Sequence, residues 1–97
     1  MPATVHVIAR YVAKAGKEDA LKAVLSALIA PSRREIGCYQ YDLLCNPSDP
    51  LDFCFVERWE HDGAFEQHSA TVHVQTAFAQ AQDLIEAPPD VRRYHIL

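Results

Sequence analysis

Residues 53–73 read FCFVERWEHDGAFEQHSATVH, and this stretch decides the fold. Its first part alternates in the manner of a strand, which places every second side chain on the same face. One face of the predicted strand carries three aromatic rings and a carboxylate, namely Phe53, Phe55, Glu57 and Trp59. A turn and helical sequence follow, with His68 and His73 five residues apart. We therefore expect a carboxyl, an indole and two imidazoles on adjoining elements, where they can furnish a pocket.

Upstream of this stretch, we expect one strand and one helix. Residues 4–13 alternate around largely apolar residues on both faces, which predicts a strand covered on both sides. Residues 17–30 repeat apolar side chains at three and four, which predicts an amphipathic helix that Pro31 ends or kinks. The S-x-x-E pattern of residues 32–35 fits a capping box for a further short turn, which Gly37 closes.

The remaining elements follow from turn and cap residues. Strands are predicted at 38–46 and 51–60, and the turn sequence at 47–50 makes them an antiparallel hairpin. Asp62 and Thr71 are the expected N-caps of two helical segments, 63–68 and one that runs to about residue 86. The second segment has a predicted buried stripe of Val74, Phe78, Ala81 and Ile85. Residues 91–97 are expected to form the last strand.

The order strand, helix, strand, strand, helix, strand predicts an α+β, ferredoxin-like βαββαβ fold with both helices on one face of an antiparallel sheet. At 97 residues the chain is expected to be a single domain, residues 1–97. The opposite face of the sheet carries many apolar residues and has no helix to cover it. We therefore predict a homodimer packed sheet to sheet.

Composition excludes several classes of function. The net charge of -4 does not favour nucleic acid as a partner. Three cysteines without a C-x-x-C pair argue against a disulfide framework or a structural zinc site and favour a reducing, cytoplasmic setting. Residues 1–4 lack the basic start of a signal peptide. No apolar run has the roughly 20 residues that a membrane span needs, so no membrane association is expected.

Glu57 is the most informative candidate for chemistry. A carboxyl among aromatic rings is poorly solvated, so its pKa rises, which suits a proton shuttle. The alternative is an ion pair with Arg33 or Arg34. His68 and His73 lie near a helix junction, where each is either a proton-transfer group or a helix-terminal histidine with no further role.

Other candidates have more ordinary alternatives. Trp59 is either a core residue or the wall of a cavity, and Arg34 either clamps an anion or is solvated. No zinc-like spacing is present, so no metal is expected, although His6, His68, His73 and Glu57 could converge. The sequence contains no flavin, nicotinamide or phosphate-loop fingerprint, and no cofactor is expected.

A set of short motifs is spread along the chain: KAGK at 14–17, REIGC at 34–38, ERW at 57–59 and AF at 64–65, with Tyr41, His68 and His73. On these motifs the chain resembles the antibiotic biosynthesis monooxygenase domain family over nearly its whole length. The resemblance implies a dimeric α+β barrel with a pocket between sheet and helices in each subunit. Family activities include cofactor-free oxidation of quinols and polycyclic phenols by O2, and relatives degrade haem or isomerise small phosphorylated carbonyl compounds.

Haem degraders of this type use an asparagine on the first strand, where this chain has His6, Ala9 and Arg10, so haem breakdown is not expected. In a cofactor-free oxygenase the substrate supplies the electrons, and the protein supplies a base and a dry pocket. The expected base is Glu57 or His68.

The same hypothesis gives the substrate-binding set. Trp59, Phe55 and Phe53 supply aromatic surface, and His73 or Arg34 donates to the anion. The alternatives are an isomerase of a small, possibly phosphorylated carbonyl compound and a non-catalytic dimeric binding protein.

Overall fold

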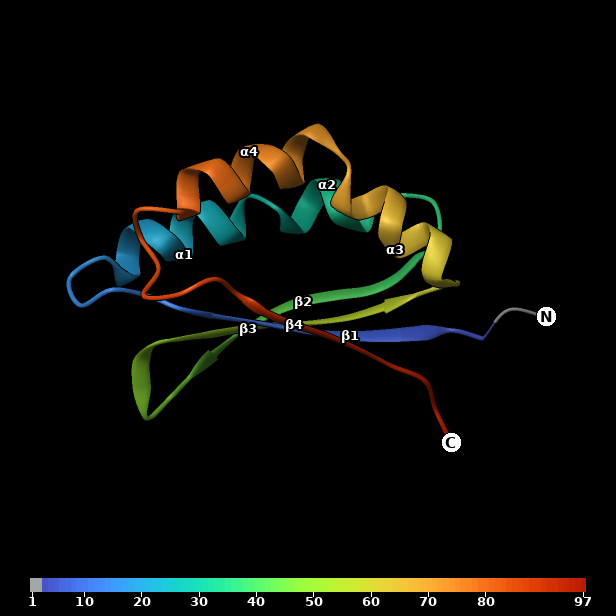
Figure 1. The fold of residues 1–97 in the computed structure, drawn as a ribbon, viewed down its shortest axis with the longest axis horizontal. Helices are drawn as coiled ribbons and strands as arrows, with labels where there is room; N and C mark the ends of the chain where they lie inside the picture. The colour runs from blue at the N-terminus through green and yellow to red at the C-terminus, as the bar shows by residue number, and fades with distance from the viewer. Residues whose placement is uncertain (1–2) are drawn as a thin grey trace.

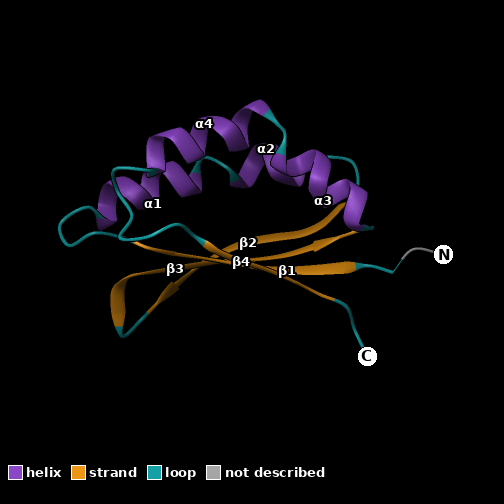
Figure 2. Ribbon diagram, viewed as in Figure 1, coloured by secondary structure: helices purple, strands orange, loops and turns teal. Residues whose placement is uncertain are grey.

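The structure is a computed structural model that describes residues 3–97. Its elements, in chain order, are β1 (Val5–Val12), α1 (Glu18–Ser26), α2 (Ile29–Arg33), β2 (Cys38–Asn46), β3 (Asp49–Trp59), α3 (Asp62–Ser69), α4 (Val72–Ala81) and β4 (Asp90–Tyr94). The strands form one sheet in the order β2-β3-β1-β4, and every neighbouring pair is antiparallel. The helices all lie on one face of this sheet (Figures 1 and 2). The predicted α+β, ferredoxin-like fold is confirmed. Met1 and Pro2, part of the segment considered for a signal peptide, lie outside the described residues.

The strand part of residues 53–73 belongs to β3, which lies inside the sheet because it pairs with β1 on one side and with β2 on the other. Its alternation is confirmed: Phe53, Phe55, Glu57 and Trp59 are all buried beneath the helices. They face the same layer as Val5, Val7, Ala9 and Tyr11 of β1, which are buried as well. The two strands thus supply most of the floor on which the helices pack.

The first helical region differs from the prediction. It is divided into α1 and the short α2, and Pro31 lies inside the first turn of α2, where a backbone N–H has no intrahelical partner to lose. Ser32 is fully buried within α2 and no helix follows Glu35, so the predicted capping box does not form. Gly37, with φ 87°, makes the turn into β2, as expected.

The second helical region is confirmed with shifted ends. The N-cap of α3 is His61, not Asp62, because the His61 Nδ1 accepts the backbone N–H of Ala64 at 3.2 Å. Thr71 caps α4 as predicted, by accepting the backbone N–H of Val74. Helix α4 ends at Ala81, five residues before the expected end at 86. The strand predicted at 91–97 occupies only residues 90–94.

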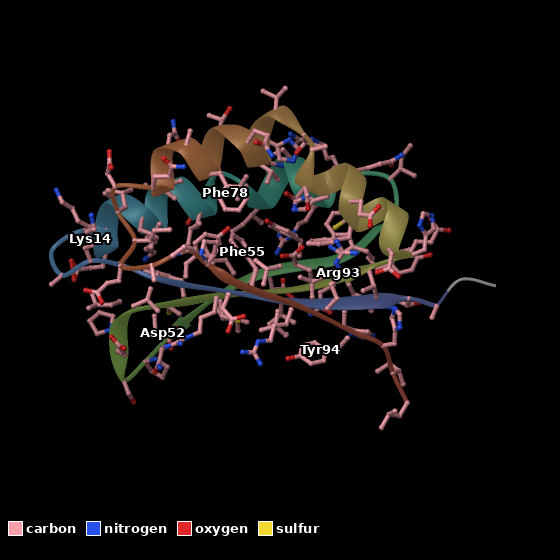
Figure 3. All side chains as sticks on the ribbon, in the orientation of Figure 1. Lys14, Asp52, Phe55, Phe78, Arg93 and Tyr94 are labelled. Carbon is pink, nitrogen blue, oxygen red and sulfur yellow. The ribbon has the colours of Figure 1, made fainter. Side chains whose placement is uncertain are left out.

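The sheet face opposite the helices has no element over it among residues 3–97 (Figure 2). It carries alternate residues of each strand, including Ile8, Val56, Leu44 and Tyr94. Tyr94 lies below the sheet in Figure 3, whereas Phe55 and Phe78 lie between sheet and helices. We expected β1 to be covered on both faces. Within residues 3–97 the helices cover only one of them. No helix within residues 3–97 is long and apolar enough to cross a bilayer.

Candidate functional site

A hollow of about 240 Å³ lies between the sheet and the helices. The sheet supplies its floor, and α3 and α4 supply its roof and one side. Most of the surface that lines it is aromatic or aliphatic, and the polar exceptions include a carboxyl group and an imidazole. The lining residues are Ala9, Tyr11, Leu28, Tyr41, Phe55, Glu57, Phe65, His68, Ser69, Val74, Phe78 and Val91. Such an apolar space with a few convergent polar groups is typical of a small-molecule site.

Glu57 is the buried acid of this hollow, with only 3% of its surface exposed. Burial raises its pKa to about 7, against the opposing effect of one hydrogen bond, which the Trp59 Nε1–H donates to Glu57 Oε1 at 2.9 Å. The nearby charge of Glu35 raises the pKa further. The alternative of an ion pair with arginine is wrong, because Arg33 pairs with Asp42 at 3.0 Å and Arg34 is exposed.

His68 stands over Glu57 from the last turn of α3. Its Nε2 lies 3.9 Å from Glu57 Oε1, and its ring packs on the Trp59 indole with centroids 4.6 Å apart. Burial lowers the pKa of His68, while the hydrogen bond and charge of Glu35 act in the opposite direction. The side chain is therefore a predominantly neutral imidazole at pH 7, with one nitrogen directed towards Glu57.

Glu35 contacts His68 at the ring nitrogen that points away from Glu57. Glu35 was not among the predicted site residues. Glu35 Oε2 lies 2.7 Å from His68 Nδ1 and 2.8 Å from His73 Nε2. Because an ionised carboxylate can only accept, Nδ1 of His68 carries the proton, and its Nε2 is left with a free lone pair on the hollow side. The partners of Glu35 are 33 and 38 residues away in sequence, so no local pattern reveals them.

The other predicted site residues are distributed around the hollow. Phe55 lines it, whereas Trp59 is fully buried behind the lining residues Glu57 and His68 and does not line the hollow itself. Phe53 is buried but borders a different recess, beneath α1. His73 contacts Glu35 and does not line the hollow, and Arg34 does not line it either.

Two tyrosines of the hollow were not among the predicted site residues. Tyr11 and Tyr41 line it from β1 and β2, and Tyr41 packs on Phe55 with ring centroids 4.9 Å apart. Burial and the Glu57 charge raise the pKa of Tyr11 to about 12, and burial also raises that of Tyr41. Both phenols therefore stay protonated and can donate. His6 lies on the opposite sheet face, so the idea that it converges with His68 is wrong.

Comparisons with known proteins identify the family and the fold of the chain. Residues 4–80 match the family model described as "Antibiotic biosynthesis monooxygenase". The chain is 34% identical over 88 residues to "Putative monooxygenase Rv0793" of Mycobacterium tuberculosis, an alignment that covers 91% of this chain and 86% of that protein. It is 32% identical over 80 residues to "Putative monooxygenase YcnE" of Bacillus subtilis, which covers 82% and 84% of the two chains.

A solved structure is similar throughout. The crystal structure of PA3566 from Pseudomonas aeruginosa superposes with a TM-score of 0.93 and 34% identity, covering 100% of this chain and 97% of that one. The fold, the extent of the family match and the names of the relatives all agree. This chain belongs to the antibiotic biosynthesis monooxygenase family.

Proposed function

We propose that this protein is a cofactor-independent monooxygenase that oxidises a small quinol or polycyclic phenol with O2 in the hollow. One observation carries the proposal. A buried carboxyl and a neutral imidazole, Glu57 and His68, face each other at 3.9 Å at the edge of an aromatic-lined space. Proton removal from the substrate is the chemistry that this pair suits best.

The proposed reaction needs no electrons from the protein. His68 Nε2 takes the hydroxyl proton of the quinol, and the resulting electron-rich anion passes electrons to O2. One oxygen atom becomes bonded to a ring carbon as a hydroxyl group, and the other leaves as water. A quinol and O2 thus give a hydroxyquinone and water. Glu57, whose pKa of about 7 leaves a substantial protonated fraction near neutral pH, supplies a proton to the reduced oxygen. Tyr11 and Tyr41 line the hollow, and in this scheme their hydroxyl groups donate to the substrate oxygens.

The surroundings of the pair support these roles. Glu35 accepts from Nδ1 of His68 and so keeps the basic lone pair on Nε2, and Trp59 anchors the Glu57 carboxyl. Glu35 and Trp59 are thus positioning residues in this scheme. Exclusion of water by Phe55, Phe65 and the tyrosine rings protects the anion from competing protonation.

The charge of the hollow favours a phenolic substrate over a phosphorylated one. Within residues 3–97, no lysine or arginine lines it. A phosphate would bring about two negative charges next to Glu57 without a cation to meet them. The isomerase of a phosphorylated carbonyl compound is therefore the weaker hypothesis.

Oxygen uptake with a panel of hydroquinones and anthrones tests the proposal. The wild-type chain is expected to consume O2 with at least one of them, and His68→Gln to reduce kcat by about 10²–10⁴-fold, the usual contribution of a positioned base. His95→Gln is the matched control, because His95 is exposed and lies outside the hollow. If the wild-type chain consumes no oxygen with any compound, or if His68→Gln keeps full activity, the proposal fails.

We also propose that the chain functions as a homodimer joined through the sheet face that has no helix over it. That face presents Ile8, Val56, Leu44 and Tyr94, and burying such a patch against a second copy is the simplest way to remove it from water. Light scattering during gel filtration is expected to give twice the chain mass. Leu44→Lys, which places a charge on an exposed part of this face, is expected to shift the mass towards that of a single chain.

A further inference from the structure

Glu35, His68 and His73 form a polar cluster at the Nδ1 edge of His68, whereas Glu57 lies at its Nε2 edge. Two imidazole nitrogens converge on a single carboxylate oxygen, at 2.7 and 2.8 Å. The three donor atoms all lie within 4.8 Å of one another. The reaction proposed above uses this cluster only to orient His68, so its second imidazole, His73, has no assigned role.

We propose that Glu35, His68 and His73 bind a divalent transition-metal ion such as Zn²⁺. Two imidazoles and one carboxylate are a donor set that zinc uses in proteins, with an open fourth position for water. Bonds of about 2.0–2.2 Å around a tetrahedral ion place the ligand atoms roughly 3.4 Å apart. The observed contacts of 2.7 and 2.8 Å are shorter, so the ion enters if each ring nitrogen moves away from the Glu35 oxygen by roughly 0.6–0.7 Å.

His73 is the least buried of the three proposed ligands, so its ring has the most room to move away from Glu35. The His73 side chain is 28% exposed, compared with 5% for His68 and 15% for Glu35. It also lines a recess between α1 and α4 that is open to solvent, together with Val24, Ala27, Leu28, Thr76, Ala77 and Gln80. This recess brings solvent to the His73 side chain from the side of α1 and α4.

The charges of the cluster also suit a cation. The Glu35 carboxylate is paired with no lysine or arginine among residues 3–97, and the two rings are its only charged or hydrogen-bonding side-chain partners there. Among the described residues, no lysine or arginine lines the recess beside His73 either. A divalent ion would therefore meet one negative charge and two lone-pair donors, without a competing positive side chain.

Metal binding would change the hollow through the tautomer of His68, and this consequence rests on the proposed function. Without metal, Nδ1–H donates to Glu35 and Nε2 is free to accept a proton. A metal on Nδ1 takes the place of that hydrogen, and the neutral ring then carries its proton on Nε2. Nε2 becomes a donor and loses its capacity as a base. The inferred site is thus an inhibitory one, in which the ion converts the base of the reaction into a hydrogen-bond donor.

Titration calorimetry of the chelator-stripped full chain with Zn²⁺ tests the binding directly, without substrate. One ion per chain is expected. His73→Gln keeps an N–H donor for Glu35 but removes the ligand, and it is expected to weaken binding by more than about 100-fold, beyond what loss of an outer-shell partner costs. Glu35→Gln is expected to do the same, and His95→Gln to leave the affinity unchanged. Thermal unfolding of each variant confirms that it is folded.

Nitrogen-15 NMR of the histidine rings supplies a second readout. On addition of Zn²⁺, the ring proton of His68 is expected to move from Nδ1 to Nε2. Absence of stoichiometric binding, or equal affinity of wild type and His73→Gln, would overturn the metal site. If zinc binds as expected but the chain never consumes oxygen, the site stands and the proposed reaction fails, so the two outcomes are distinguishable.

Discussion

Glu57 makes the stability of the fold depend on pH, in a direction opposite to that of an ordinary carboxyl group. Its pKa is raised from 4.5 to about 7 in the folded chain, chiefly by burial. Between these values the folded state binds more protons than the unfolded state, so the free energy of unfolding falls as the pH rises. The shift of 7 − 4.5 corresponds to a loss of about 3 kcal/mol in all, of which roughly 2.5 kcal/mol falls between pH 5 and pH 8.

Glu57→Gln isolates this contribution, because glutamine has nearly the same shape and no charge to bury. The difference in unfolding free energy between the two proteins at pH 5 serves as the reference, because Glu57 is then protonated in the folded wild type and carries no charge. By pH 8 the wild type is expected to have lost about 2.5 kcal/mol relative to the variant. Urea unfolding followed by fluorescence measures both, since Trp59 is the one tryptophan of the chain and is fully buried.

His68 also makes the stability depend on pH, with the opposite sign. Burial lowers its pKa, so its contribution is present above pH 6.5 and is lost as the pH falls, which is opposite to that of Glu57. The comparison of wild type and Glu57→Gln largely removes it, because both proteins contain this ring. All measurements are made at one protein concentration and with a chelator present. Differences in self-association or metal binding then do not contribute to the measured free energies of unfolding. A difference that stays flat between pH 5 and pH 8, or grows in favour of the wild type, would refute the assigned burial of the Glu57 charge.

Two further substitutions test the turn into β2 and the partner of the acid. Gly37→Ala is expected to destabilise the chain by about 2–4 kcal/mol, since an added Cβ at φ 87° would lie 2.8 Å from Ala64 Cβ. Gly16→Ala has a similar φ of 84° but open space around it, so about 1 kcal/mol is expected in the same urea assay, and equal losses would contradict the assigned clash. Trp59→Phe removes the N–H bonded to Glu57 and is expected to move the pH transition of stability upward, as followed by circular dichroism.

The local parts of the architecture were predictable from sequence. Alternation in β3 fixed which side chains face the helices, because a strand reverses face at every residue and aromatic rings must leave water. The hairpin turn after β2 and the Thr71 cap were predictable because each depends on residues close together in the chain, although the turn occupies residues 47–48 and not 47–50, since β3 begins at Asp49. The division of the first helix was not predicted in this form, because Pro31 is tolerated in the first turn of a new helix.

The site was only half visible from sequence. Glu57 and His68 were found because a carboxyl group rarely shares a strand face with three aromatic rings, and because a histidine follows it at the next helix junction. Glu35 was assigned instead to a capping box, since its local sequence fits that pattern while its real partners lie across the fold. The arginine next to it, Arg34, was chosen as an anion clamp but is exposed. Contacts between distant segments decide which neighbouring charged residue turns inward, and no local periodicity encodes them.

The same burial acts in opposite directions on the two groups of the site. In water a proton prefers imidazole over carboxylate, because the ordinary pKa of histidine, 6.5, exceeds that of glutamate, 4.5. In the hollow this order is inverted, since the pKa of Glu57 is raised to about 7 and that of His68 is lowered. Between these two pKa values the proton therefore resides on the carboxyl, and both groups are neutral. A neutral pair is cheaper to bury than an ion pair, and it presents substrate with a free base and an acid at once.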